Sequence, residues 1–164
     1  MLMLDGAAAW GTGNALGDLL TGRAANDALS GMGGDDRILG GLGRDVLSGG
    51  TGADVFVFNS VADSVIATVR SDRITDFSRA EGDRIRLAAI DANVTNADGT
   101  NDAVTFIGAA GFTAGVAGQL RTFFNAAAGA PVVQGDVNGD GRADFQTLPM
   151  SPTNLGPTAG DFLL

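Results

Sequence analysis

Aspartates recur every nine residues through the first half of the chain, and each is followed two positions later by a large apolar residue. The phrase Gly49-Gly-Thr-Gly-Ala-Asp54-Val-Phe56-Val fits the nonapeptide G-G-x-G-x-D-x-U-x, where U is a large apolar residue. A second phrase without mismatch begins at Gly40, and a third that differs at one position begins at Gly31. Five aspartates share this slot: Asp18, Asp27, Asp36, Asp45 and Asp54.

The nonapeptide predicts a tight turn followed by a very short strand. Glycine in a helix or ladder-forming strand costs backbone entropy, whereas a turn uses its freedom to adopt positive φ. Two phrases make one coil, so equivalent positions stack every eighteen residues. Stacking places Asp18, Asp36 and Asp54 along one edge, with Asp27 and Asp45 along the other. Carboxylates spaced about 4.8 Å apart repel one another unless a cation lies between them.

The predicted ligands are all oxygen atoms, which favours several calcium ions. Turn carbonyls complete a wide shell of about six to eight oxygens, which suits calcium better than magnesium. The chain has no histidine and no cysteine, which argues against zinc as the metal. The predicted side-chain ligands are Asp18, Asp27, Asp36, Asp45, Asp54, Asp63 and Asp72. The predicted backbone ligands are the carbonyls of Gly31, Gly33, Gly34, Gly40, Gly41, Gly43, Gly49, Gly50 and Gly52.

The nine-residue phase continues after the glycines end. Asp63 and Asp72 lie nine and eighteen residues after Asp54, and Val65 and Ile74 lie at the same intervals after Phe56. We therefore expect Asp63 and Asp72 to close the last calcium sites against Asp45 and Asp54. The alternative is coincidence in a chain rich in aspartate.

A second acidic phrase runs from Asp136 to Asp144. It matches the start of a D-x-[DN]-x-[DN]-G calcium loop, with ligands expected from Asp136, Asn138, Asp140, the carbonyl of Arg142, and Asp144. The usual bidentate glutamate position holds Thr147 instead. A hairpin turn stabilised by Asp and Asn side chains, with no ion, is the alternative.

Composition narrows the class of protein. The net charge is −9, with 19 acidic against ten basic residues, which argues against nucleic-acid and anionic-membrane partners. The absence of cysteine excludes a disulfide framework. No apolar run approaches the about 20 residues of a membrane span, and the first ten residues lack the features of a cleavable signal peptide. A flexible linker is the alternative for a Gly/Asp-rich tract, and the strict phase argues against it.

The predicted fold class is all-β, with a parallel β-roll continuing into a C-terminal β-sandwich-like module. We expect residues 1–12 to form a lead-in or N-terminal cap. Residues 13–75 are expected to form the roll, and residues 76–164 the C-terminal module. Within that module, Ile74, Phe77, Ile85 and Leu87 are expected to face inward. Further strands are expected at residues 103–107, 119–125, 131–134 and 143–148.

These features resemble the C-terminal region of serralysin-type (M10 family) metalloproteases and related RTX exoproteins. The likeness rests on the nonapeptides, the Gly52–Asn59 transition, the segment Asp72–Phe77, the phrase Gly135–Phe145 and the ending Asp161-Phe-Leu-Leu164. The resemblance implies calcium binding, folding outside the cell, and an uncleaved C-terminal signal read by a type I secretion apparatus. It therefore implies a secreted, extracellular protein with an upstream catalytic domain as a possible partner.

This chain itself is expected to be non-catalytic, because serralysins hold zinc with His-Glu-x-x-His and the chain contains no histidine. An enzymatic alternative would use Asp76 and Asp83 as an acid/base pair, or would make the chain the accessory module of a polysaccharide lyase or epimerase. A second alternative is a small adhesive surface protein, although five repeats are few for that role.

Overall fold

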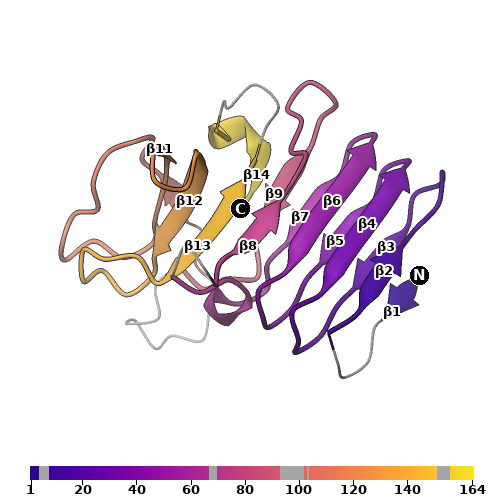
Figure 1. Ribbon diagram of the computed structural model, residues 1–164. Helices are drawn as coiled ribbons and strands as arrows, with labels where there is room; N and C mark the ends of the chain where they lie inside the picture. Colours follow the sequence, from indigo (N-terminus) through magenta and orange to yellow (C-terminus); the bar gives the residue numbers. More distant parts are fainter. Residues whose placement is uncertain (4–7, 67–69, 93–101, 103, 151–155) are drawn as a thin grey trace.

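The structure is a computed structural model that describes residues 1–3, 8–66, 70–92, 102, 104–150 and 156–164. These residues form two β-sheets that face each other across an apolar core (Figure 1). The only helical elements in the described ranges are two 3-10 turns, Val61–Asp63 and Ala159–Asp161. The prediction of an all-β fold is confirmed.

One sheet has six strands and the other has eight. The six-stranded sheet contains, in spatial order, β1 (Leu2–Met3), β3 (Leu19–Thr21), β5 (Arg37–Leu39), β7 (Val55–Val57), β9 (Arg84–Arg86) and β14 (Phe162–Leu163). The eight-stranded sheet contains β10 (Thr105–Phe106), β11 (Gln119–Asn125), β12 (Ala130–Asp136), β13 (Phe145–Pro149), β8 (Asp72–Ile74), β6 (Val46–Thr51), β4 (Ala28–Gly33) and β2 (Trp10–Thr12).

Successive nonapeptides place their strands alternately in the two sheets, so the chain winds as a coil. Leu20 pairs with Ile38 and Ile38 with Phe56 in parallel register, each step being eighteen residues. Leu29 pairs with Leu47 in the opposite sheet at the same interval. The two-phrase coil predicted from the repeats is therefore the observed unit of the roll.

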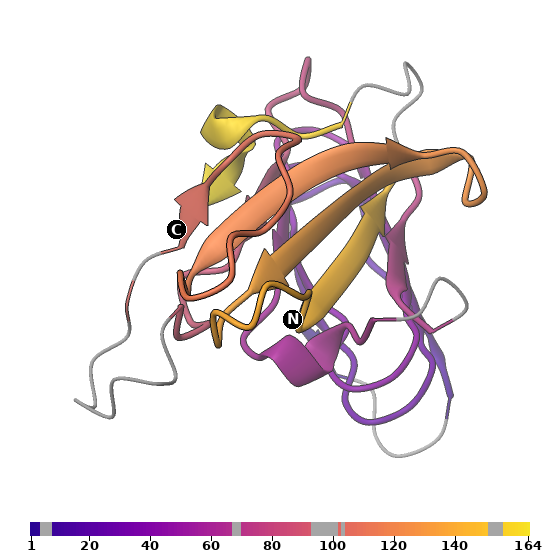
Figure 2. The same ribbon diagram turned by 90° about the vertical axis from the view of Figure 1, so that its left-hand side faces the viewer.

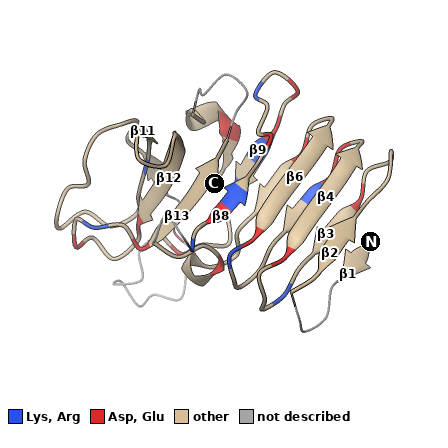
Figure 3. Ribbon diagram, viewed as in Figure 1, with Lys and Arg blue, Asp and Glu red and all other residues tan. Residues whose placement is uncertain are grey.

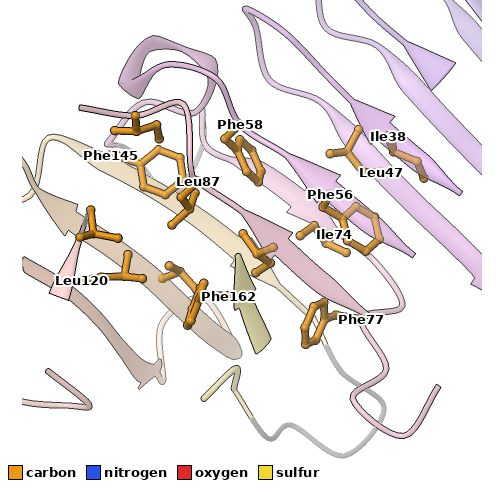
Figure 4. Close-up of a cluster of buried hydrophobic side chains, with 14 of the residues drawn as sticks. Ile38, Leu47, Phe56, Phe58, Ile74, Phe77, Leu87, Leu120, Phe145 and Phe162 are labelled. Atoms are coloured by element: carbon orange, nitrogen blue, oxygen red, sulfur yellow. The ribbon is translucent and has the colours of Figure 1, made fainter. Parts of the chain in front are cut away.

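Each nonapeptide contributes one large apolar side chain to the space between the sheets. The five residues in this slot are at most 2% exposed: Leu20, Leu29, Ile38, Leu47 and Phe56. Figure 4 shows this series continuing past Ile74 to Phe162 near the chain end. Full burial of one such side chain stabilises a fold by about 1.5 to 3 kcal/mol. A core that gains one per nine residues is thin, so the roll needs other stabilising interactions.

The coil continues past Phe56, but the spacing of its strands changes. Ile74 lies opposite Leu47, 27 residues earlier, and Ile85 lies opposite Phe56, 29 residues earlier. Those extra residues that the structure describes lie in loops outside the sheets, one of which contains the turn Val61–Asp63. The prediction that Val65 shares the core position of Phe56 is therefore wrong, since the Val65 side chain is 40% exposed. Ile74 is buried as expected, in the sheet opposite to that of Phe56.

The C-terminal part of the chain extends the two sheets of the roll. Strands β11, β12 and β13 form an antiparallel meander, and β13 then pairs in parallel with β8 (Figure 2). The final strand β14 pairs in parallel with β9. The predicted inward positions Phe77, Ile85 and Leu87 are all buried. Of the expected strands, β11 has the predicted bounds and the other three shift by a few residues, with Ala103 outside the described residues.

The two ends of the predicted roll lie inside continuous sheets. Leu2 pairs with Leu20 and Trp10 with Ala28, so the segment expected as a lead-in already supplies two roll strands. At the other end, the expected boundary after residue 75 follows β8, which hydrogen-bonds both to β6 and to β13. Neither boundary interrupts a sheet.

Candidate metal centres

Aspartates form two hydrogen-bonded rows, one along each edge of the roll. In each row the Oδ1 atom of one aspartate accepts the backbone N–H of the row member one coil earlier, at 2.6 to 3.0 Å. The first row is Asp18, Asp36, Asp54 and Asp83. The second row is Asp27, Asp45 and Asp72. Figure 3 shows acidic residues near the turns at both edges.

The second carboxylate oxygen separates these aspartates into two groups. The Oδ2 atoms of Asp36, Asp45, Asp54 and Asp72 are buried and have no hydrogen-bond partner. A buried polar atom without a partner is costly, and buried charges in proteins are normally paired or bound to a metal. These four oxygens therefore mark the positions where a cation fits.

The remaining row members have their Oδ2 atoms occupied by donors from the chain. Asp18 Oδ2 accepts the backbone N–H of Asn14 at 3.0 Å, and Asp27 Oδ2 accepts that of Arg23 at 3.3 Å. Asp83 Oδ2 accepts the N–H of Ser78 at 2.8 Å. Cation ligation at these three positions would have to displace or share a hydrogen bond.

The first glycine of each repeat leaves room for the free oxygen. A Cβ atom built on Gly31 would overlap Asp36 Oδ2 and lie 2.5 Å from the carbonyl oxygen of Gly49. The first glycines at positions 40 and 49 lie in the same way against Oδ2 of their own aspartates. A carboxylate oxygen and, at Gly31, a carbonyl oxygen thus converge on a space that any side chain would fill.

The other predicted glycines shape the turns. Positive φ angles between 87° and 137° occur at Gly34, Gly41, Gly43, Gly50 and Gly52. Gly33 lies in β4, where an added Cβ atom would meet Thr51 Oγ1 at 3.0 Å. Met32 occupies the second glycine position of its repeat and has a φ of 80°, which is unfavourable for a residue with a side chain.

Burial raises the pKa values of the row carboxyls in the metal-free chain. It raises the pKa of Asp45 to about 7, that of Asp54 to about 6 and that of Asp72 to about 8, and neighbouring carboxylates add to the effect. The pKa values of Asp36 and Asp83 are raised for the same reasons. The metal-free rows therefore favour bound protons at the positions where a cation would replace them.

The available donors suit a hard cation. Within the described residues, no group of three or more acidic side chains converges on one point, so carboxylates alone do not complete a site. Backbone carbonyls of the glycine-rich turns are the further oxygens that the repeats predict as ligands. Calcium accepts six to eight such oxygens in flexible geometry, whereas magnesium requires a tight octahedron.

The structure changes the predicted roles of Asp63 and Asp72. Asp72 joins the row of Asp45, not that of Asp54, because it lies 27 residues after Asp45, nine more than the repeat spacing of 18. Asp63 leaves the row and caps the 3-10 turn, where its Oδ2 accepts the N–H of Asn59 at 2.7 Å. The Asp63 carboxylate still repels the second row electrostatically, since it helps raise the pKa values of Asp45 and Asp72.

Asp83 takes the last position of the first row, which the nine-residue phase does not predict. A different signal in the sequence marks it. The tripeptide Asp-Arg-Ile occurs at Asp36, Asp72 and Asp83, and in each case the aspartate is a row member and the isoleucine enters the core. The short unit of aspartate, any residue and a large apolar residue (D-x-U) therefore keeps its structural role after the repeat spacing of 18 residues changes.

The loop between β12 and β13 directs its acidic side chains to its own backbone. The two carboxylate oxygens of Asp136 accept the N–H groups of Gly139 and Gly141 at 2.7 and 2.9 Å. Asp144 accepts two backbone N–H groups and the side-chain amide of Asn138. Asp140 accepts the N–H of Arg142 at 2.8 Å. These contacts are those of the ion-free hairpin alternative.

The proposed acid/base pair of Asp76 and Asp83 is engaged in structural contacts. Asp76 accepts hydrogen bonds from the Ser48 hydroxyl and from the N–H groups of Gly49 and Gly50. Both Asp83 oxygens accept backbone N–H groups. These contacts fix the turn of the third full repeat and leave no free pair directed at a cavity.

Parallel strands that alternate between two sheets and stack every eighteen residues, with aspartates along both edges, define a parallel β-roll of RTX nonapeptides. The chain belongs to the family described as peptidase M10 serralysin C terminal, whose model matches residues 19–150. Modules of this family are non-catalytic in general and come from secreted proteins. No curated protein sequence matches the chain.

Solved structures with a similar fold include two subunits of the mannuronan C5-epimerase of Azotobacter vinelandii. The solution structure of its AlgE6R2 subunit is 27% identical, with a TM-score of 0.63, over 96% of this chain and 89% of that chain. The AlgE6R3 subunit is 23% identical, with a TM-score of 0.57, over 98% of this chain and 81% of that chain, a likeness of fold alone. Among the described residues, no helix is long and apolar enough to cross a membrane.

Proposed function

We propose that this chain is a non-catalytic calcium-binding module whose folding is driven by calcium outside the cell. The observation that carries this proposal is the set of four buried, unpartnered Oδ2 atoms of Asp36, Asp45, Asp54 and Asp72. Calcium, when bound, supplies the positive charge that these oxygens lack. The three further row members, Asp18, Asp27 and Asp83, make weaker contributions because their oxygens already accept hydrogen bonds.

Mass action links calcium to folding. Bringing the carboxylates together in the metal-free rows opposes folding, because they are buried and repel one another. A ligand that binds only the folded chain stabilises it by RT ln(1 + [L]/Kd). Extracellular calcium modules have dissociation constants of about 10⁻⁴ to 10⁻³ M, well above cytosolic calcium. The chain is therefore unfolded inside the cell and folded outside it.

The C-terminal residues carry the proposed signal for a type I secretion apparatus. In the folded chain Asp161 is bound by Arg79 at 2.8 Å, and Phe162 is packed against Phe106 with ring centroids 5.5 Å apart. The backbone of Leu163 accepts the N–H of Leu87. An exporter that reads these residues must meet them before they dock, which agrees with export of the unfolded chain.

The partner proposed for this module is a catalytic domain upstream, in a serralysin-like protease. Family membership supports this choice. A second candidate is an accessory module of a polysaccharide-processing enzyme, which the likeness to subunits of a mannuronan C5-epimerase favours. Attaching each kind of catalytic domain and measuring its activity with and without the module would separate the two.

The decisive experiment for the calcium proposal is a calcium titration followed by far-UV circular dichroism, with magnesium as control. We expect strand signal to appear with calcium and not with magnesium. Replacing Asp36 or Asp45 by Ala should shift the midpoint to higher calcium, whereas Asp140→Ala should not. Fluorescence of Trp10 is a poor substitute, because its side chain is 89% exposed in the fold. A chain equally folded in chelator would refute the proposal.

A further inference from the structure

A shallow groove crosses the outer face of the roll near its first coils. It spans β2, β4 and β6, which lie side by side at the N-terminal end of the eight-stranded sheet (Figure 1). Its volume is about 210 Å³, and all the residues that line it are uncharged. The groove lies on the face of the sheet that points away from the core, so its side chains are not needed to fill the space between the sheets.

The register of these three strands arranges the side chains of the groove in two rows. The apolar row is Trp10, Ala28 and Val46, and the hydroxyl row is Thr12, Ser30 and Ser48. Residues two apart in a strand point to the same face, so the two rows run beside each other, while Leu29 and Leu47 between them point into the core. Neighbouring members of each row lie about 4.8 Å apart, the spacing of paired strands. An apolar strip thus runs along a line of hydroxyl groups.

Trp10 borders this groove and contributes little to the fold. It is the only tryptophan of the chain, and its side chain is 89% exposed, the largest exposed fraction among the large apolar side chains that the structure describes. In the described part of the chain it belongs to neither cluster of buried apolar side chains. The small side chain of Ala28 beside it leaves the floor of the groove open. A wide aromatic ring that stands free next to an open floor is suited to contact with a ligand.

The polar groups of the groove are hydroxyls, and one of them is already oriented. The Ser48 hydroxyl donates to Asp76 Oδ2 at 2.6 Å, which fixes its direction and leaves its oxygen as an acceptor. Hydroxyl groups both donate and accept hydrogen bonds, so the row of Thr12, Ser30 and Ser48 matches a ligand that bears hydroxyls itself. The groove carries no charge and the chain has a net charge of −9, which disfavours an anionic ligand.

We propose that this groove binds a neutral, extended polysaccharide chain that lies across β2, β4 and β6. A pyranose ring has an apolar face of C–H groups and a rim of hydroxyls, which match the apolar row and the hydroxyl row. One ring lies over Ala28 against the indole of Trp10, and the next lies over Val46. The strand spacing of about 4.8 Å is close to the length of one sugar unit in an extended chain, so successive rings meet successive strands. A second copy of this chain that added a strand to the edge would pair with the backbone of β2 and would leave the outer face open.

The test is a fluorescence titration of the full chain, in which Trp10 is the only tryptophan and reports on the groove directly. Far-UV circular dichroism first identifies the solution, with calcium or with chelator, in which the chain is folded, so the result does not depend on the calcium proposal. We expect cellohexaose, an extended neutral chain, to shift the emission to shorter wavelength, because a stacked ring excludes water from the indole. Maltohexaose, whose chain coils, should bind at least about tenfold more weakly. A folded chain whose emission ignores cellohexaose, or responds equally to both sugars, overturns this inference.

Variants separate the groove from the rest of the surface. Trp10→Ala, followed by calorimetry, should weaken cellohexaose binding at least about tenfold, as expected for a central aromatic contact. Thr12→Val keeps the side-chain shape and should weaken binding about fivefold through the loss of one hydrogen bond. Ala28→Leu fills the floor and should abolish the shift while Trp10 remains. Leu16→Ala is the matched control, because Leu16 is 72% exposed and lies outside the groove, and it should bind as the parent does.

Self-association is the competing explanation for an exposed tryptophan. An emission that shifts to shorter wavelength as the protein concentration rises, without any sugar, would show that a second copy covers the groove and would overturn the saccharide assignment. Equal binding by the parent and by Trp10→Ala would place the sugar elsewhere and overturn it as well. Emission that is independent of protein concentration, together with loss of binding in both Trp10→Ala and Ala28→Leu, is the result that the proposal predicts.

Discussion

Replacing Asp72 by Asn should have opposite effects with and without calcium. Burial raises the pKa of this carboxyl from the ordinary 3.8 to about 8. At pH 7 the unfolded chain carries it ionised, so the metal-free fold must take up a proton. One pKa unit corresponds to about 1.4 kcal/mol, which makes this cost about 4 kcal/mol at most. Asparagine has no such cost.

The expected net gain is smaller than this limit. Asparagine keeps an oxygen that accepts the N–H of Asp45, but its amide group replaces an Oδ2 atom that has no partner in the protein. A buried donor without an acceptor costs about 1 to 3 kcal/mol. We therefore expect Asp72→Asn to stabilise the metal-free fold by about 1 to 3 kcal/mol. At saturating calcium the same change removes a charged ligand and should raise the calcium midpoint about tenfold, or about 1.4 kcal/mol.

The assay is far-UV circular dichroism at pH 7, which measures the folded fraction in chelator and follows a urea titration in calcium. Asp18→Asn is the matched control, because Asp18 lies in a row but its Oδ2 accepts the N–H of Asn14. It should lower stability slightly under both conditions. If Asp72→Asn destabilised the chain equally in chelator and in calcium, Asp72 would be a structural hydrogen-bonding residue and the assignment of its free oxygen to a cation would fail.

Three further outcomes follow from the structure. In chelator, acid should stabilise the fold. Because the pKa values of Asp45, Asp54 and Asp72 are raised, their contribution to the free energy of unfolding is complete below about pH 4 and is lost as the pH rises to about 8. A circular dichroism pH series would detect or contradict this change. Met32→Gly should stabilise the folded chain by about 1 to 2 kcal/mol in thermal melts, because Met32 has a φ of 80°, whereas Leu42→Gly at an ordinary φ should give no gain. Asp140→Ala should leave the number of bound calcium ions unchanged in equilibrium dialysis, and the loss of an ion would place a site in the 136–144 loop.

The roll could be predicted from the sequence because two signals share one period. Aspartate and apolar residues both recur every nine residues, and the hydrogen bond between coils from Asp36 to Asp54 spans eighteen residues, which is two of these periods. The predicted core slot from Leu20 to Phe56 is confirmed for this reason. Turn chemistry adds to the signal, since Gly41 and Gly43 adopt the positive φ that the glycine phrase indicates.

The end of the roll could not be predicted from the same period. Hydrogen bonding between coils fixes the D-x-U unit within the sheet, but it sets no length for the loop outside it. Spacings of 27 and 29 residues therefore replace 18 without disturbing the rows. Counting in nines then assigns Asp63 to a row and misses Asp83. The pairing of β13 with β8 joins Thr147 to Asp72 and has no local signal at all.

The division of the row aspartates into two groups also depends on three-dimensional detail. Asp27 and Asp45 occupy the same repeat slot, one coil apart, yet one Oδ2 accepts the N–H of Arg23 and the other has no partner. The Asp27 repeat has Arg23 where the Asp45 repeat has Gly41, which adopts positive φ. The different backbone of that turn decides whether an N–H reaches the carboxylate.

The most direct test of the calcium assignment is anomalous diffraction from crystals of the chain grown in calcium. We predict calcium peaks beside the Oδ2 atoms of Asp36, Asp45, Asp54 and Asp72, with glycine-turn carbonyls completing each shell. A well-ordered roll with no peaks at these four oxygens, or with calcium confined to residues 136–144, would contradict the account.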